Sequence, residues 1–114
     1  MIITGDWHST FVNDIKEDFS DPDSATVASE FVGTSISTND DAIVYGPYYG
    51  PMIPANRTSS SSTGTGAVTS AACSTGASGR TDLRTVPTVS RPDAPVSTFA
   101  SFVVEDGRPG AQLV

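Results

Sequence analysis

The chain has 114 residues, which is enough for one small domain or for one part of a larger one. Its 13 Asp and Glu outnumber its 6 Lys and Arg, and the net charge of −7 argues against a surface that binds nucleic-acid phosphates. No apolar run approaches the roughly 20 residues that a membrane-spanning helix needs, so we expect no membrane span.

The first half of the chain predicts two strands and a short helix. Residues 1–4, Met-Ile-Ile-Thr, predict a buried strand that ends at Gly5. The segment from Phe11 to Phe19 predicts one or two helical turns. Residues 25–37 are rich in β-branched and aromatic side chains and predict a strand with a bulge at Gly33.

Beyond residue 37, the sequence predicts a loop, one strong strand and a tail. Residues 45–54 contain two Gly-Pro pairs and predict a loop. Residues 98–105 form the strongest strand pattern in the chain, closed by a turn at Asp106-Gly107. Residues 108–114 predict a frayed tail. Together the elements predict a chain that is rich in strand and poor in helix.

A low-complexity stretch lies between the predicted loop and the strong strand. Residues 57–79 consist almost entirely of Ser, Thr, Gly and Ala, and Arg57 is their only charged residue. This composition is typical of a flexible linker, so we expect residues 57–79 to be disordered. The chain is thereby divided into segment 1–56, the low-complexity stretch 57–79, and segment 80–114.

The polar motif Gly5-Asp6-Trp7-His8 directly follows the first predicted strand. Side chains two positions apart in extended backbone point the same way, so Asp6 and His8 would present an oxygen and a nitrogen donor together. This pair suits a bound transition metal. The pair is also consistent with a surface aspartate beside an ordinary loop histidine.

A second acidic group lies further along the chain and comprises Asp14, Glu17, Asp18, Asp21 and Asp23. Its spacing does not match a calcium-binding loop, which needs alternating ligands and a glycine at the sharp turn. The spacing favours a solvated acidic face.

Several blocks of the sequence closely resemble the C-terminal region of alkaline phosphatase D (PhoD-like) enzymes, which belong to the metallophosphoesterases. The resembling blocks are Gly5–Asp14, Ser29–Ser37, Tyr49–Asn56, Arg80–Val86 and Ser90–Glu105, in the family's order. The resemblance implies a mixed α/β, β-rich fragment of a layered metallophosphoesterase sandwich, and the hydrolysis of phosphate esters. It also assigns Asp6 and His8 to a metal centre that contains iron and calcium.

The resemblance further implies that this chain depends on a missing N-terminal portion. The family enzyme is several times longer, and its other metal ligands come from earlier segments. We therefore expect the isolated chain to have no phosphatase activity. The family is exported through a twin-arginine signal; this sequence shows no signal, so the chain as written is expected in the cytoplasm.

The low-complexity stretch departs from the family pattern in a specific way. After Asn56 the family continues Pro-His-Ile-Lys-Phe-Phe-Asp-Gly-Asp-Arg-Arg-Gly-Tyr. With suitable synonymous codons, DNA for residues 56–69 encodes those residues once a single nucleotide is inserted behind the Asn56 codon. Extended towards Gly79, the same shift can give Glu-Trp just before Arg80. We infer a frameshift near Asn56 that is compensated near Gly79.

An alternative from another functional class remains open at the level of sequence. The chain would then be a non-enzymatic, β-rich binding or structural module with a flexible Ser/Thr/Gly linker. This alternative predicts cooperative folding without metal, whereas a decayed enzyme fragment predicts none.

Overall fold

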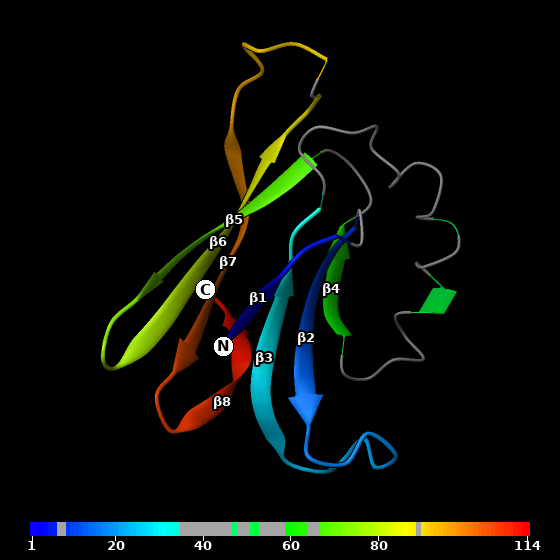
Figure 1. The fold of residues 1–114 in the computed structure, drawn as a ribbon, viewed down its shortest axis with the longest axis vertical. Helices are drawn as coiled ribbons and strands as arrows, with labels where there is room; N and C mark the ends of the chain where they lie inside the picture. Colours follow the sequence, from blue (N-terminus) through cyan, green and yellow to red (C-terminus); the bar gives the residue numbers. More distant parts are fainter. Residues whose placement is uncertain (7–8, 35–46, 48–50, 53–58, 64–66, 89) are drawn as a thin grey trace.

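Eight β-strands make up the structure, a computed structural model that describes residues 1–6, 9–34, 47, 51–52, 59–63, 67–88 and 90–114 (Figure 1). The strands are β1 (Ile2–Thr4), β2 (Thr10–Lys16), β3 (Thr26–Val32), β4 (Ser59–Thr63), β5 (Ala67–Ser74), β6 (Ser78–Val86), β7 (Ser97–Glu105) and β8 (Arg108–Leu113). Among the residues described, no helix has the length and hydrophobicity required to cross a bilayer.

The strands form two four-stranded sheets. The first sheet has the order β1-β3-β2-β4, and the second has the order β5-β6-β7-β8. Every neighbouring pair is antiparallel except β1 and β3, which run parallel at one edge of the first sheet. Figure 1 shows the first sheet beside the second, with β8 closest to β3.

A small hydrophobic core joins the two sheets. Val12 and Phe31 come from the first sheet, and Leu83 and Phe102 come from the second. The rings of Phe31 and Phe102 lie 5.9 Å apart at an angle of 59°, which is a favourable tilted geometry. Since one cluster contains residues from both sheets, the fold is a two-layer β-sandwich. The expected β-rich, layered class is confirmed.

The predicted helix at residues 11–19 is wrong, because this segment lies mostly in β2. Thr10 and Val12 are buried while Phe11 between them is only half-buried, which is the period of a strand. β2 hydrogen-bonds β3 on one side and β4 on the other. The pairings with the next strand, β3, and with the distant β4 override a weak local helix preference.

The predicted disorder of residues 57–79 is wrong for the residues that the structure describes there. β4 pairs with β2, and β5 pairs with β6 over its whole length, from Ala67 opposite Val86 to Ser74 opposite Gly79. A strand ladder needs backbone donors and acceptors, which Ser, Thr and Ala supply as well as larger residues. The low apolar content leaves the ladder intact.

The predicted frayed tail at residues 108–114 is also wrong, because β8 pairs with β7 there. The turn predicted at Asp106-Gly107 is confirmed and sets up this hairpin. Gly107 has φ +68°, in the left-handed region that favours glycine. Val114 extends the pairing by donating its N–H to the carbonyl of Ser101 at 3.0 Å.

The remaining predicted elements have mixed outcomes. The strand at residues 98–105 is confirmed as β7. The strand at residues 25–37 is found as β3, which ends before Gly33 rather than passing through it in a bulge; residues 35–37 lie outside the described part. The loop predicted at 45–54 falls almost entirely outside the described residues.

The first predicted strand is present as β1, but its predicted burial is wrong. Ile2 and Ile3 are both exposed, and β1 forms the edge of the first sheet, where β3 is its one neighbour among the described strands.

Asp14 links the two sheets in a way that its sequence neighbours did not indicate. Its Oδ1 accepts hydrogen bonds from the Ser29 hydroxyl at 3.2 Å and from the backbone N–H of Ala111 on β8 at 3.1 Å. Gly110, the residue before Ala111, has φ +117°, so a residue with a side chain would be strained at that position. One carboxylate thus connects β2, β3 and β8.

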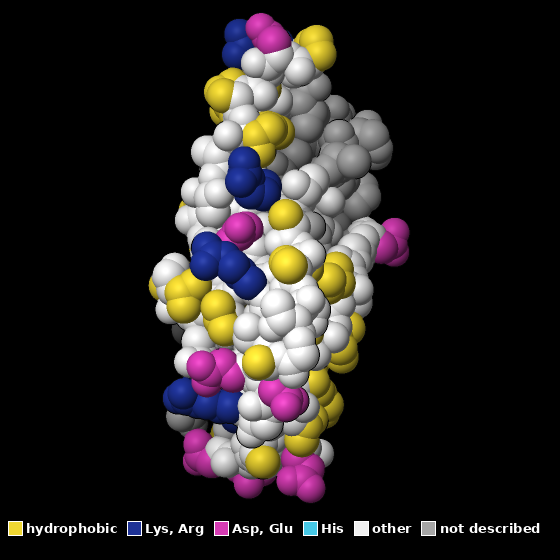
Figure 2. Space-filling view, turned by 90° about the vertical axis from the view of Figure 1, so that its left-hand side faces the viewer, with side chains coloured by type: hydrophobic (Ala, Val, Ile, Leu, Met, Phe, Trp, Pro, Cys, Tyr) yellow, Lys and Arg dark blue, Asp and Glu magenta, His cyan; other side chains and the backbone are white. Residues whose placement is uncertain are grey.

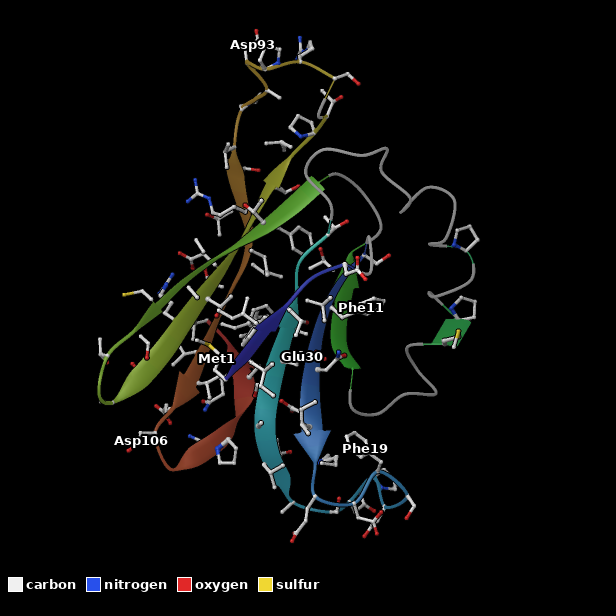
Figure 3. All side chains as sticks on the ribbon, in the orientation of Figure 1. Met1, Phe11, Phe19, Glu30, Asp93 and Asp106 are labelled. Carbon is white, nitrogen blue, oxygen red and sulfur yellow. The ribbon has the colours of Figure 1, made fainter. Side chains whose placement is uncertain are left out.

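Replacing Asp14 is expected to loosen β8. Asp14→Ala leaves the N–H of Ala111 without its acceptor, at a cost of about 1–3 kcal/mol, so the Ala111 amide should exchange with solvent at least several-fold faster. Asp14→Asn retains an acceptor oxygen and should lose less. Asp93→Ala, at an exposed site far from β8 (Figure 3), is the control. Equal exchange rates in all three variants would contradict this role.

Candidate metal centre

Asp6 follows Gly5 beyond the carboxyl end of β1 and has an unusual backbone conformation. Its φ is +74°, and it is the one non-glycine residue in the described part of the chain with positive φ. Aspartate tolerates this left-handed region better than most residues, at a cost of order 1 kcal/mol. Its side chain is exposed. Such strain gathers at functional sites, and here it occurs at the predicted metal ligand.

The ends of β1 and β3 are fastened together next to Asp6. The N–H of Gly33 donates to the carbonyl of Thr4 at 2.9 Å. A Cβ added at Gly5 would meet the carbonyl oxygen of Gly33 at 3.8 Å, so the two glycines pass close to each other. Because β1 and β3 are parallel, their carboxyl ends lie side by side at the same end of the sheet. In α/β folds, ligand sites lie at the carboxyl ends of parallel strands.

A buried hydroxyl without a partner lies at the same end of the sheet. β2 starts there with Thr10, the residue before Phe11, which is paired with Val32 at the end of β3. Thr10 is 1% exposed, and its Oγ1 is a buried side-chain atom for which the described structure holds no hydrogen-bond partner. Buried hydroxyls are normally bonded, so this atom is available to a water or a ligand.

The structure places one of the two predicted ligands. Trp7 and His8 lie outside the described residues, so Asp6 is the predicted ligand whose backbone position is known. Within the described ranges, His, Cys, Asp and Glu side chains form no group of three or more that could hold a metal ion. The exposed Asp6 carboxylate fits a hard cation such as calcium or iron, but calcium alone takes about six to eight oxygen ligands. The described residues therefore fit one part of a centre.

Glu30 supports the strand that carries Asp6, a role that the sequence patterns did not indicate. On the outer face of the first sheet, its Oε1 accepts from the Thr4 hydroxyl at 3.1 Å and its Oε2 accepts from the Asn13 amide at 3.0 Å. Figure 3 shows Glu30 on β3 between β1 and β2. The signal available in the sequence was a lone carboxylate in the middle of a strand.

The acidic group after β2 behaves largely as predicted. Glu17, Asp18, Asp21 and Asp23 are exposed, whereas Asp14 is half-buried in the contact with β8. Asp18 shapes the turn by accepting from the hydroxyl and the N–H of Ser20, at 2.6 and 2.8 Å. The Ser20 hydroxyl, followed by the Ser20 N–H, holds the pKa of Asp18 below its usual range.

A further polar cluster lies on the second sheet, away from Asp6. Oδ1 of Asp82 accepts from the Ser101 hydroxyl at 2.6 Å and from Nε of Arg80 at 3.1 Å. These contacts, Ser101 first, lower the pKa of Asp82. On this side of the molecule, Figure 2 shows basic, acidic and hydrophobic side chains interspersed. The cluster stabilises neighbouring strands β6 and β7.

Comparisons with known proteins identify a solved structure and a family model that match this chain. A solved structure of PhoD matches with a TM-score of 0.79 and 28% sequence identity, over 98% of this chain and 21% of that chain. This chain therefore spans about a fifth of the PhoD chain. No curated protein matches the sequence. A family model described as PhoD-like phosphatase matches residues 1–80. Since that match covers more than half of the sequence, the chain belongs to the PhoD-like phosphatase family.

Proposed function

We propose that this chain is the part of a PhoD-type phosphatase that contributes Asp6 and His8 to a metal centre for the hydrolysis of phosphate esters. Iron and calcium are the proposed ions. The observation that carries the proposal is the left-handed backbone of Asp6 at the joined carboxyl ends of β1 and β3. The family membership supports the reaction class.

The residues of this chain would hold and orient the centre. When bound, the ions supply Lewis-acid polarisation of the phosphoryl oxygens and neutralise charge on the leaving oxygen. Asp6 provides a carboxylate ligand on a backbone fixed by the hydrogen bond between Gly33 and Thr4. Glu30 keeps β1 attached to β3 through Thr4, which limits movement of Asp6.

We also propose that the chain alone does not turn over substrate. Two ligands leave most coordination positions of an iron or calcium ion to water or to other segments. The substrate, a phosphate ester, would bind productively only where those further ligands are present. Export is likewise proposed as a property of the complete family enzyme.

Metal binding to the 114-residue chain tests the assignment of Asp6. Asp6→Asn removes a charged ligand and keeps a residue that tolerates positive φ, so the backbone is preserved. We expect calorimetric titration with Ca²⁺, and with Fe²⁺ under anaerobic conditions, to show at least tenfold weaker binding for Asp6→Asn than for the unchanged chain. Asp93→Asn is the control and should bind as the unchanged chain does.

Three results would count against the proposal. Equal affinity in Asp6→Asn and in the unchanged chain would remove Asp6 from the ligand set. Metal-dependent hydrolysis of p-nitrophenyl phosphate by the isolated chain would show that it is active alone. A cooperative unfolding transition that is unaffected by metal, together with no metal binding, would favour a non-enzymatic module.

A further inference from the structure

The strand β5 is the longest edge strand in the two described sheets, and its sequence contains none of the residues that protect an edge. It has eight residues, and β6 is its one neighbour among the described strands (Figure 1). Its sequence contains no charged residue and no proline. Its ladder with β6 runs from Ala67 to Ser74 without a register shift. A long, regular and uncharged edge is a template for the addition of another strand.

The other edge strands of the described sheets each have such a protection. β1 has three residues and β4 has five, and the ladder of β4 with β2 contains a register shift. β8 contains Arg108 and Pro109, and its ladder with β7 also contains a register shift. Short length, charge, proline and bulges all hinder the pairing of an edge with another chain. Among these edges, β5 is therefore the one best suited to accept a strand.

The distribution of charge indicates that the added strand comes from a second copy of this chain. Each copy has a net charge of −7, so two copies repel each other over most of their surfaces. No Asp or Glu occurs from residue 57 to residue 81, and β6 contributes Arg80 and Arg84 against the single acid Asp82. Two copies can therefore approach each other at β5 with little repulsion. A strand that meets its own copy about a two-fold axis forms a self-complementary interface.

The faces of the second sheet limit the register of such a pair. Ala71 is opposite Asp82, whose neighbours Thr81 and Leu83 are buried, so Ala71 lies on the outer face. Thr69, two positions earlier, lies on the same face. In a continuous sheet, residues directly opposite each other share a face. A two-fold axis near the middle of β5 therefore brings position 71 of one copy next to positions 69 and 71 of the other.

We propose that β5 pairs antiparallel with β5 of a second copy, so that the second sheets of two chains form one continuous sheet. The pairing joins backbone donors and acceptors, and the exposed side chains at position 69 and positions 71–74 are all small. This interface involves neither Asp6 nor a metal ion. Its failure would therefore leave the proposed function unaffected.

Analytical ultracentrifugation of the 114-residue chain tests the pairing. We expect a dimer whose population rises with protein concentration. Ala71→Lys should weaken the dimer at least tenfold, because like charges would then lie side by side in the pair. Within one chain the new ammonium group lies opposite Asp82, so the second sheet should keep its fold. The control Ala25→Lys makes the same change at an exposed residue before β3 and should not weaken the dimer.

A second variant of opposite charge distinguishes a lost interface from a lost fold. Thr69→Glu places a carboxylate opposite Arg84 within one chain, and it should also weaken self-association. A mixture of Ala71→Lys chains and Thr69→Glu chains should restore the dimer, because the ammonium group of one copy then lies beside the carboxylate of the other. Variants that had failed to fold would not be rescued by mixing.

Amide hydrogen exchange locates the contact in the chain. At concentrations where the dimer forms, the N–H groups of β5 that face away from β6 should exchange at least several-fold more slowly than in the monomer. The exchange of β8 amides should not depend on concentration, because the edge of β8 is not part of the interface.

Four results would overturn the proposal. The first is a chain that stays monomeric at every concentration at which it is soluble. The second is a dimer that Ala71→Lys weakens no more than Ala25→Lys does, because that dimer uses another surface. The third is a mixture of the two charged variants that forms no dimer. The fourth is growth into open-ended aggregates without a dimer, which contradicts a two-fold interface.

Discussion

We define the restored chain as one in which residues 57–79 carry the sequence that the shifted reading frame encodes. Its free energy of unfolding is expected to exceed that of the present chain by on the order of 10 kcal/mol. The shifted frame supplies two Phe, an Ile, a Tyr and a Trp in place of small polar residues. Each large apolar side chain that becomes fully buried contributes about 1.5–3 kcal/mol. A gain of this size equals the total stability of an ordinary domain.

The strand register shows where one of these side chains would lie. Ser61 on β4 is directly opposite Val12, a core residue, and Ser62 is opposite Phe11. Residues directly opposite each other in a ladder share a face of the sheet, so a phenylalanine at position 61 would be placed beside Val12 and Phe31. In the shifted reading frame, positions 61 and 62 are both phenylalanine.

Urea unfolding followed by far-UV circular dichroism measures the effect. We expect a clear cooperative transition for the restored chain and a weak or absent one for the present chain. The single substitution Ser61→Phe should recover up to about 1.5–3 kcal/mol, and Ser62→Phe, on the opposite face, should recover less. Equal free energies of unfolding for the restored and present chains would contradict the frameshift inference. The actual coding DNA provides a second test: it would contradict the inference if its shifted reading frame did not encode the family residues.

The second large effect is expected for Phe31→Ala, which should cost about 3–5 kcal/mol. Phe31 is fully buried and contacts Phe102 across the two sheets. The described core contains few other large apolar side chains, so the cavity cannot be filled by rearrangement without separating the sheets. In the restored chain, this loss should lower the urea midpoint strongly.

Phe99→Ala is the matched control for this measurement. Phe99 is 56% exposed on β7, so the same chemical change should cost far less. Equal midpoints for Phe31→Ala and Phe99→Ala would show that the two sheets do not pack through Phe31. An increase in midpoint for Phe31→Ala would contradict the two-layer packing altogether.

The candidate site could be predicted only in part. The motif around Asp6 and His8 was visible in the sequence, as was the family resemblance. The left-handed backbone of Asp6, the unpartnered Thr10 hydroxyl and the support from Glu30 required the structure. Each of these features depends on neighbours from other strands, which a local pattern does not specify.

Local sequence determined the parts of this protein that form from adjacent residues. The strand at 98–105 and the turn at Asp106-Gly107 follow from β-branched and aromatic side chains and from the freedom of glycine. The tertiary structure decided the strand at β2, the pairing of β4 and β5, and the link from Asp14 to Ala111, 97 residues away. The physical reason is that a strand is completed by hydrogen bonds from a partner distant in sequence, so its formation depends on where that partner lies as well as on its own residues.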